Sequence, residues 1–222
     1  MSKKIYLIAS FLIVIIAFVL AGVLYSSMPD KIASHWGISG EVNGYMSKSW
    51  GLFMPPAIIL ILFLFFLILP RLDPLKKNIK EFENYYYGFI TVIILFLFYI
   101  YLLTIFWNQG FNLDIIRFLI PGFAILMYAA GVVMAKSKQN WFMGIRTPWT
   151  LSSEKVWHET HQLGARLFEA SAIISLIGIF IKQYAFWLLI IPIVLSAIIA
   201  FIYSYLIYKK EIKKHDQATP SL

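Results

Sequence analysis

Long apolar runs separated by short polar segments extend along the whole chain. An α-helix needs about 20 mostly apolar residues to cross the roughly 30 Å hydrocarbon core of a bilayer. Charge-free runs of this length predict five spans, at residues 5–27, 51–69, 85–107, 118–135 and 184–208. A sixth span is predicted over residues 164–181, where Arg166 and Glu169 stand near the start and an apolar core begins at Ala170. The pattern therefore predicts an all-α, polytopic membrane bundle of about six transmembrane helices.

The distribution of Lys and Arg predicts how these spans are oriented. Cytoplasmic loops of membrane proteins carry an excess of Lys and Arg near the ends of their spans. Of the 19 such residues, all but four fall on the side that holds both termini, the loop after the second span and the loop after the fourth. The exceptions are Lys31, Lys48, Arg117 and Lys182. We therefore predict a multi-pass protein of the cell membrane with cytoplasmic N- and C-termini.

Composition agrees with a membrane domain. Hydrophobic residues make up 60% of the 222 residues and charged residues 14%, whereas soluble domains carry about a quarter charged residues. The net charge of +8 would suggest a nucleic-acid partner for a soluble protein, but here the one-sided distribution of Lys and Arg explains it, so no direct nucleic-acid binding is predicted. The chain contains no cysteine, which excludes disulfides and thiolate metal sites.

The sequence lacks the usual marks of an enzyme or a pump. It contains neither a glycine-rich phosphate loop nor a GxSxG nucleophile motif, and no carboxylate pair is placed for acid and base roles. No ionisable side chain stands near the middle of a predicted span, although ion-coupled transporters usually need one. We therefore expect no cofactor and no enzymatic activity. A channel or transporter is disfavoured, except for a lipid or hydrophobic peptide cargo.

The first loop, residues 28–50, is predicted to lie outside the cell and to be compact. Its turn-forming residues are Gly37, Gly40, Asn43 and Gly44. His35 shares the loop with Asp30 and Glu41, but a single histidine with scattered carboxylates is weak evidence for a metal site. We expect His35 to form a hydrogen bond within the loop.

The loop after the fourth span is predicted to be cytoplasmic and to contain the start of a helix. Pro148 disfavours helix at Thr147. Ser152 or Ser153, followed by Glu154, predicts the N-cap of a helix that runs into the fifth span.

Two histidines on this predicted helix form a polar face. Glu154, His158, His161 and Ala165 follow one another at helical spacing and are expected to share that face. The order of residues approaches the HExxH zinc motif, but the second histidine comes three rather than four positions after the first. We therefore predict no metal site.

Both loops contain motifs that resemble those of the SdpI family of bacterial and archaeal membrane proteins. The stretch GIRTPWT over residues 144–150 is specific to the family's main module, and Asn43 stands where an aspartate is common in the preceding small domain. The matching positions are Met28, Pro29, Asp30, Lys31, Ile32, His35, Trp36, Gly40, Asn43, Gly44, Tyr45, Ser47 and Lys48 in the first loop, and Asn140 to Thr150, Trp157, His161 and Gly164 in the second.

This resemblance implies a membrane immunity and signalling protein. The family's namesake protects bacteria from a secreted peptide toxin and sequesters a cytoplasmic transcriptional repressor when toxin is bound. The resemblance also implies two units. Residues 1–70 would form a two-helix unit with the extracellular loop 28–50. Residues 71–222 would form an SdpI-like four-helix unit with the cytoplasmic loop 136–165 and a short C-terminal tail.

Our leading hypothesis is a non-enzymatic receptor for a secreted peptide toxin or similar amphipathic ligand, with membrane lipids as further partners. The expected ligand-binding residues outside are Pro29, Asp30, His35, Trp36, Gly40, Asn43, Gly44 and Tyr45. The expected signalling residues inside are Asn140, Gly144, Arg146, Thr147, Pro148, Trp149, Trp157, His158 and His161, with Arg146 as the principal polar contact.

Two alternatives to this hypothesis stay open. In the first, residues 144–150 only close the helical bundle. In the second, the protein is a membrane enzyme or a lipid- or peptide-handling protein, and its polar centre is formed by Arg146, His158, Glu159 and His161 beside the headgroups.

Overall fold

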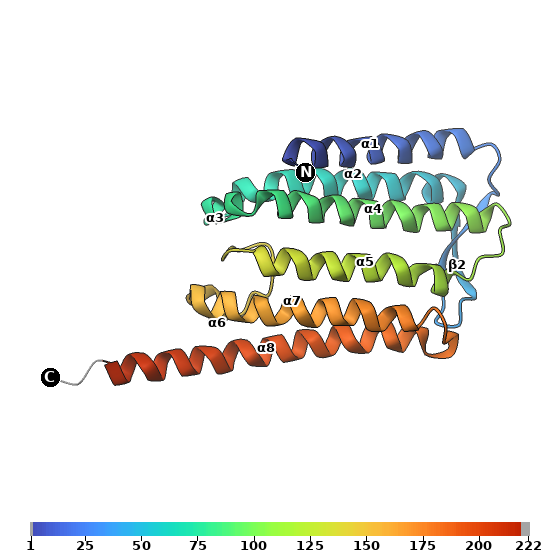
Figure 1. Cartoon of the computed structure of the whole chain (residues 1–222). Coiled ribbons are helices and arrows are strands. Elements are labelled where there is room, and N and C mark those ends of the chain that lie inside the picture. Colours follow the sequence, from blue (N-terminus) through green and yellow to red (C-terminus); the bar gives the residue numbers. More distant parts are fainter. Residues whose placement is uncertain (1, 219–222) are drawn as a thin grey trace.

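The computed structural model describes residues 2–218, and helices dominate it (Figure 1). The elements in chain order are α1 (Lys3–Leu24), β1 (Lys31–Trp36), β2 (Val42–Ser47), α2 (Lys48–Leu72), α3 (Lys76–Glu81), α4 (Glu83–Asn108), α5 (Ile115–Lys136), α6 (Pro148–Ser152), α7 (Glu154–Ile177), the 3-10 turn η1 (Lys182–Tyr184) and α8 (Ala185–Ala218).

The described part of the chain has five helices that are long and apolar enough to cross a membrane: α1, α2, α4, α5 and the segment Lys182–Lys214, which contains most of α8. Each of the five charge-free runs coincides with one of them, which confirms a polytopic, helical membrane bundle. Helix α7 has 24 residues but is not among the five, since its first half is polar. The sixth span over residues 164–181 therefore stays a prediction, as does the orientation.

Successive long helices run in opposite directions (Figure 1). The hairpin of β1 and β2 consequently lies at one end of the bundle, here called the hairpin end. The N-terminus, α3, α6 and the last turns of α8 lie at the opposite end, here called the loop end, together with residues 137–153, which connect α5 to α7 and are here called the α5–α7 loop.

The long helices form two groups of three, with α1, α2 and α4 in one and α5, α7 and α8 in the other (Figure 1). The groups meet where α4 packs against α5. Within the second group α5 and α7 approach closely, because a Cβ on Gly131 would lie 2.8 Å from the backbone oxygen of Ala165. The predicted division at residue 70 stays a prediction about domain organisation.

Buried hydroxyl pairs join helices inside both groups. Ser10 of α1 and Thr91 of α4 are 3.0 Å apart, and Ser171 of α7 and Ser196 of α8 are 2.9 Å apart. Such pairs satisfy polar groups that cannot reach water inside a membrane.

The first loop departs from the all-α expectation, because it folds as an antiparallel hairpin of β1 and β2. The turn needs Gly40, whose φ is +91°. Ile32 is fully buried against α2, where a Cβ on Gly51 would lie 2.6 Å from the Ile32 Cβ. The predicted compactness therefore comes from paired strands that sit on the helix ends.

Helix α8 is longer than the predicted span. It continues through the charged segment after Tyr208 to Ala218, where the sequence had suggested a short tail. The remaining residues of that tail, 219–222, lie outside the described residues.

Candidate functional site

Asn108, the last residue of α4, holds the hairpin in place. The Ala33 backbone N–H donates to Asn108 Oδ1 at 2.7 Å, and Asn108 Nδ2 donates to the Ala33 oxygen at 3.1 Å. The same Nδ2 also donates to the Thr104 oxygen within α4 at 2.8 Å. The amide thus substitutes for a neighbouring strand and fixes the hairpin rigidly on the bundle.

Three predicted ligand-binding residues form the exposed surface of the hairpin. His35 and Asn43 lie on paired strands, and His35 Nδ1 forms a hydrogen bond with Asn43 Oδ1, which confirms the expected bond within the loop. Gly44 leaves room for this histidine, because a Cβ there would lie 2.9 Å from the His35 Cβ. Tyr45 has 60% of its surface exposed.

Among the other predicted residues of this loop, Trp36 holds the hairpin on the bundle. It stacks edge to face on Trp107 of α4 with ring centroids 5.8 Å apart. Asp30 pairs with Lys48 at 3.0 Å, but its side chain is exposed, as is Pro29 before β1. The structure therefore separates Trp36, which packs on α4, from the exposed residues of the predicted set.

A pocket of about 820 Å³ adjoins the hairpin turn. It is lined by Ile38 and Ser39 of the turn, Ile116 of α5 and residues 180–183 between α7 and α8. Ile38 is 62% and Phe180 83% exposed. Sequence patterns did not indicate this site, because its walls come from three segments that are far apart in the chain.

Charged groups mark the rim of this pocket. Lys182 pairs with Asp114 at 2.8 Å, and the Asp114 side chain also caps α5 by accepting from the Arg117 N–H at 3.3 Å. Large apolar side chains exposed beside a charged rim suit an amphipathic ligand.

At the loop end, His161 is the centre of the α5–α7 loop. Its Nε2 accepts from the Ile145 N–H at 2.9 Å, and its Nδ1 donates to the Trp157 oxygen at 2.8 Å. These two bonds fix a neutral tautomer, and burial lowers the pKa of His161 to about 4. Trp157 stacks on the imidazole with centroids 3.9 Å apart. Gly144 has a φ of +105° and faces Nε2 so closely that a Cβ would overlap it.

Residues Thr147 to Thr150 close the loop against α8. Thr147 is extended before Pro148, as predicted, and forms a reciprocal capping box with Thr150 at the start of α6. The Thr147 hydroxyl also lies 3.1 Å from Ser204 Oγ of α8. Trp149 packs on Phe201 and Tyr205 with centroids 5.3 Å and 5.1 Å away. Most of residues 147–150 therefore have a structural role, since they hold the loop against α8.

Two buried polar side chains shape the first half of the loop. Asn140 Oδ1 accepts from the N–H groups of Phe142 and Met143 at 3.0 Å and 2.7 Å. Asp73, which follows α2, accepts from the Trp141 N–H at 2.9 Å and is only 2% exposed. Sequence reasoning missed Asp73, although a lone carboxylate within the basic stretch PRLDPLKK is an available signal.

Arg146 and His158 lie on the surface, unlike His161. Arg146 Nη1 donates to the Trp141 oxygen at 2.9 Å, and the rest of the guanidinium is exposed. The four residues share one face of the continuous helix α7, as predicted, but this face is not uniformly exposed: Glu154 and His158 are exposed, whereas His161 and Ala165 are buried. The reason is that this face turns from water into the bundle between His158 and His161.

Of the four residues of the alternative polar centre, His161 is already bonded to the backbone. Both ring nitrogens of His161 are occupied by backbone groups. Among the side chains that the structure describes, residues 2–214, no group of three or more His, Cys, Asp or Glu could hold a metal ion.

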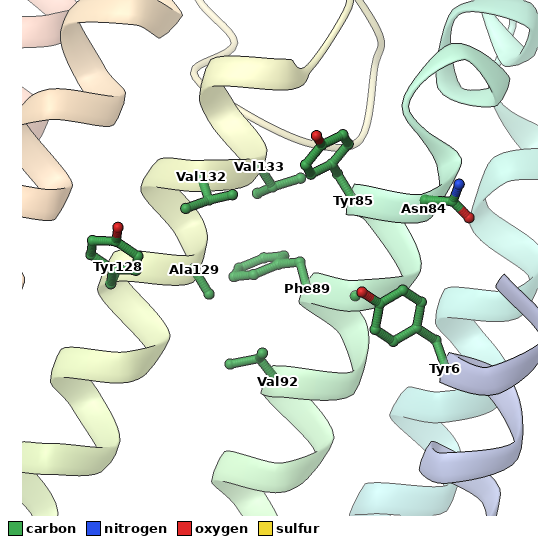
Figure 2. A pocket seen from close by; sticks show the side chains of 10 residues that line it. Tyr6, Asn84, Tyr85, Phe89, Val92, Tyr128, Ala129, Val132 and Val133 are labelled. Carbon is green, nitrogen blue, oxygen red and sulfur yellow. The ribbon is translucent and has the colours of Figure 1, made fainter. Parts of the chain in front are cut away.

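A groove of about 560 Å³ separates α4 from α5 near the loop end. Figure 2 shows Phe89 of α4 pointing towards Ala129 of α5, with Tyr85, Tyr128 and Tyr6 around them. The lining holds no charged side chain and none of the predicted site residues. It can accept apolar groups from the membrane but offers no chemistry for catalysis.

Comparison with known proteins agrees with this arrangement. The model of the SdpI/YfhL protein family matches residues 136–204, which include the α5–α7 loop, and the model "Domain of unknown function (DUF1648)" matches residues 12–60, which include the hairpin. The Immunity protein SdpI of Bacillus subtilis (strain 168) is 28% identical over 204 residues, 91% of this chain and 96% of that relative. No solved structure matches the chain significantly.

The two matched segments contain the two sets of loop residues described above, in the same order along the chain. The alignment with this relative extends over nearly the whole length of both proteins, so the similarity includes the helices that connect the loops. The chain is therefore similar to the SdpI/YfhL family in residues 136–204 and to the Immunity protein SdpI over nearly its full length.

Proposed function

We propose that the protein gives its host immunity by binding a secreted, amphipathic peptide toxin at the hairpin end. The similarity to an immunity protein over nearly its full length supports the general role. Many large apolar side chains are exposed along the spans, where lipid covers them. Ile38 and Phe180 differ, because they belong to connections between elements and line a pocket with a charged rim.

The pocket beside the hairpin carries this proposal. Apolar anchors in a preformed hollow contribute most to protein–peptide binding, since they add buried area at little cost in conformational entropy. The Asn108 bonds hold the hairpin wall, and α5 forms a second wall at Ile116. The exposed His35 and Tyr45 extend the surface away from the pocket.

The test is protection of a sensitive host that expresses the protein and is challenged with a panel of purified secreted peptide toxins. For the toxin that the wild type resists, the double variant Ile38→Ala, Phe180→Ala should lower the toxin concentration that the host survives by at least about tenfold. A loss of roughly 1.4 kcal/mol in toxin binding has this effect. Phe111→Ala is the matched control, because Phe111 is 56% exposed in the connection between α4 and α5 and does not line the pocket.

Protein abundance in the membrane is measured in parallel. Equal protection by the double variant and the control at matched abundance would show that the pocket is not the binding site. Absence of protection by the wild type against every member of the panel would count against the immunity role.

The strand surface is tested separately. His35→Ala with Tyr45→Ala should weaken protection without changing abundance, because both side chains are exposed. Trp36→Ala should lower abundance as well, since Trp36 packs on Trp107. Full protection by the His35 and Tyr45 double variant would remove the strands from the site.

We further propose that the loop end signals toxin binding to the cell by holding a transcriptional repressor at Arg146. One donor of the guanidinium binds the Trp141 oxygen, and the exposed remainder can clamp a carboxylate or a row of carbonyl groups. Lys cannot reproduce a planar fork. Arg146→Lys should therefore resemble Arg146→Ala in induction of a repressor-controlled reporter.

Immunity and reporter induction are scored separately in both Arg146 variants at equal abundance. If Arg146 supplied only positive charge or the single bond to Trp141, Lys would preserve most of the function. Wild-type induction by Arg146→Lys would thus contradict the signalling role and favour a purely structural α5–α7 loop.

A further inference from the structure

A second pocket lies at the loop end, far from the hairpin, between α1, α2 and α3. It has a volume of about 480 Å³. Four basic residues line it, Lys3 of α1, Arg71 of α2 and Lys76 and Lys80 of α3, together with one carboxylate, Glu83 of α4. The pocket is separate from the α5–α7 loop and contains none of the predicted site residues.

Three of the four basic groups are available to a ligand. Lys3 pairs with Glu83 at 3.3 Å and lies over the Tyr87 ring, 4.8 Å from its centroid. Arg71, Lys76 and Lys80 are exposed, and they form no ion pair with any residue that the structure describes. The pocket therefore has excess positive charge at one rim.

The floor of the same pocket is apolar. It is formed by Leu7 of α1 and by Leu64, Leu67 and Ile68 of α2. Leu64 and Ile68 are 48% and 49% exposed on a helix that is apolar enough to span the membrane. The floor is thus continuous with the side of the bundle that faces lipid.

We infer that this pocket binds an anionic phospholipid from the leaflet at the loop end. Basic pockets between transmembrane helices at one membrane surface suit lipid phosphates. In this proposal Arg71 of α2 binds the phosphate with the planar set of donors of its guanidinium. Lys76 and Lys80 of the neighbouring short helix α3 add positive charge, and one acyl chain of the lipid lies along Leu67 and the other apolar residues of the floor. A free phosphate has the same charge but makes no use of the apolar floor, so the shape of the pocket favours the lipid.

The test measures binding of phosphatidylglycerol to the purified full-length protein in detergent by native mass spectrometry. The triple variant Arg71→Gln, Lys76→Gln, Lys80→Gln should bind at least about tenfold more weakly, because each basic group near a phosphate contributes on the order of a fivefold change. The control is Lys209→Gln, Lys210→Gln, Lys213→Gln, which removes the same charge from exposed positions of α8 at the same end. It should bind as the wild type does.

A second pair of variants tests the apolar floor and does not depend on the charges. Leu67→Trp fills the floor and should weaken binding roughly tenfold, the effect of about two buried methylene groups. Ile61→Trp, at a 64% exposed position of α2 outside the pocket, should have no effect.

Inorganic phosphate and phosphatidylethanolamine serve as competitors. Neither should displace phosphatidylglycerol at equal concentration. Equal loss of binding in both triple variants would overturn the site in favour of unspecific charge attraction. Displacement by inorganic phosphate, or unchanged binding to Leu67→Trp, would overturn the lipid as the ligand.

Discussion

Gly144 combines a positive φ with close contact to the His161 imidazole, and either property alone would select glycine. We predict that Gly144→Ala destabilises the protein by about 3 kcal/mol, because the methyl group strains the backbone and displaces the acceptor of the Ile145 N–H. Thermal unfolding in detergent measures the change.

Gly22→Ala is the control for that substitution. A Cβ on Gly22 meets nothing within 4 Å, and alanine in a helix stabilises by about 0.5–1 kcal/mol relative to glycine. An unfolding temperature of Gly144→Ala equal to that of the control would contradict the proposed packing.

His161 predicts a specific dependence of stability on pH. Its pKa is lowered to about 4 from an ordinary 6.5, so between these values the unfolded chain binds a proton that the folded chain does not. Stability therefore falls as pH decreases from about 6.5 to about 4, by on the order of 3 kcal/mol, and this contribution is fully present above 6.5.

The measurement compares unfolding temperatures from pH 4 to pH 7. In His161→Gln the unfolding temperature should depend less on pH, because the contribution of His161 protonation is absent. His158→Gln, at an exposed position one turn earlier, should keep the pH dependence of the wild type. Identical slopes in the two variants would show that protonation of His161 is not linked to unfolding.

For single residues, the sequence indicated the positions of distinctive residues better than the contacts that they form. GIRTPWT lies in the segment that matches the SdpI/YfhL family model, and the extended Thr147 before Pro148 followed from rules for proline. The role of Asp73 could not be predicted, because its partner is a backbone N–H 68 positions away. The opposite exposure of His158 and His161 depends on how the α5–α7 loop folds over His161 through Gly144 and Ile145, which no periodicity within α7 specifies.

Among the elements, the hairpin depends on α4 for its position. We predict that Asn108→Ala leaves the helices intact but raises amide hydrogen exchange of β1 and β2 roughly thirtyfold, because two bonds to Ala33 are lost at about 1 kcal/mol each.

Asn112→Ala, at an exposed position between α4 and α5, is the control and should exchange as the wild type does. Unchanged exchange in Asn108→Ala would mean that the burial of Ile32 is sufficient to hold the hairpin.

The long apolar helices were predictable because length and hydropathy alone specify a span, whatever its neighbours are. The hairpin was not, because its six-residue strands mix apolar and polar residues without a strict alternation and gain stability from Asn108 and Gly51, outside their own sequence. The pocket at the hairpin turn is a still less local feature, since it exists only when α5 and the α7–α8 connection are in place.

For the whole molecule, the alternating helices (Figure 1) place the elements that carry the two sets of Lys and Arg at opposite ends, apart from Arg166, which lies within α7. We predict that a reporter of the kind that works only in the cytoplasm is active when inserted near Lys77. A reporter of the kind that works only outside the cell is predicted to be active near Asn43. Moving basic residues from the loop end to the hairpin end should produce a mixed orientation. Activity of the opposite kind at either position would reverse the assignment.

The length of α8 has a consequence for access to the loop end. Its residues beyond Tyr208 continue the helix by about 15 Å at 1.5 Å per residue, and in Figure 1 they project past all other helices. The first turn of this extension is bonded to the residue between α6 and α7, because the Ser153 hydroxyl donates to Glu211 Oε2 at 2.7 Å. We expect this extension to hinder approach to the α5–α7 loop from the side of α8. A folded protein that docks on the loop would then reach its exposed residues, Trp141 and Arg146 among them, from another side.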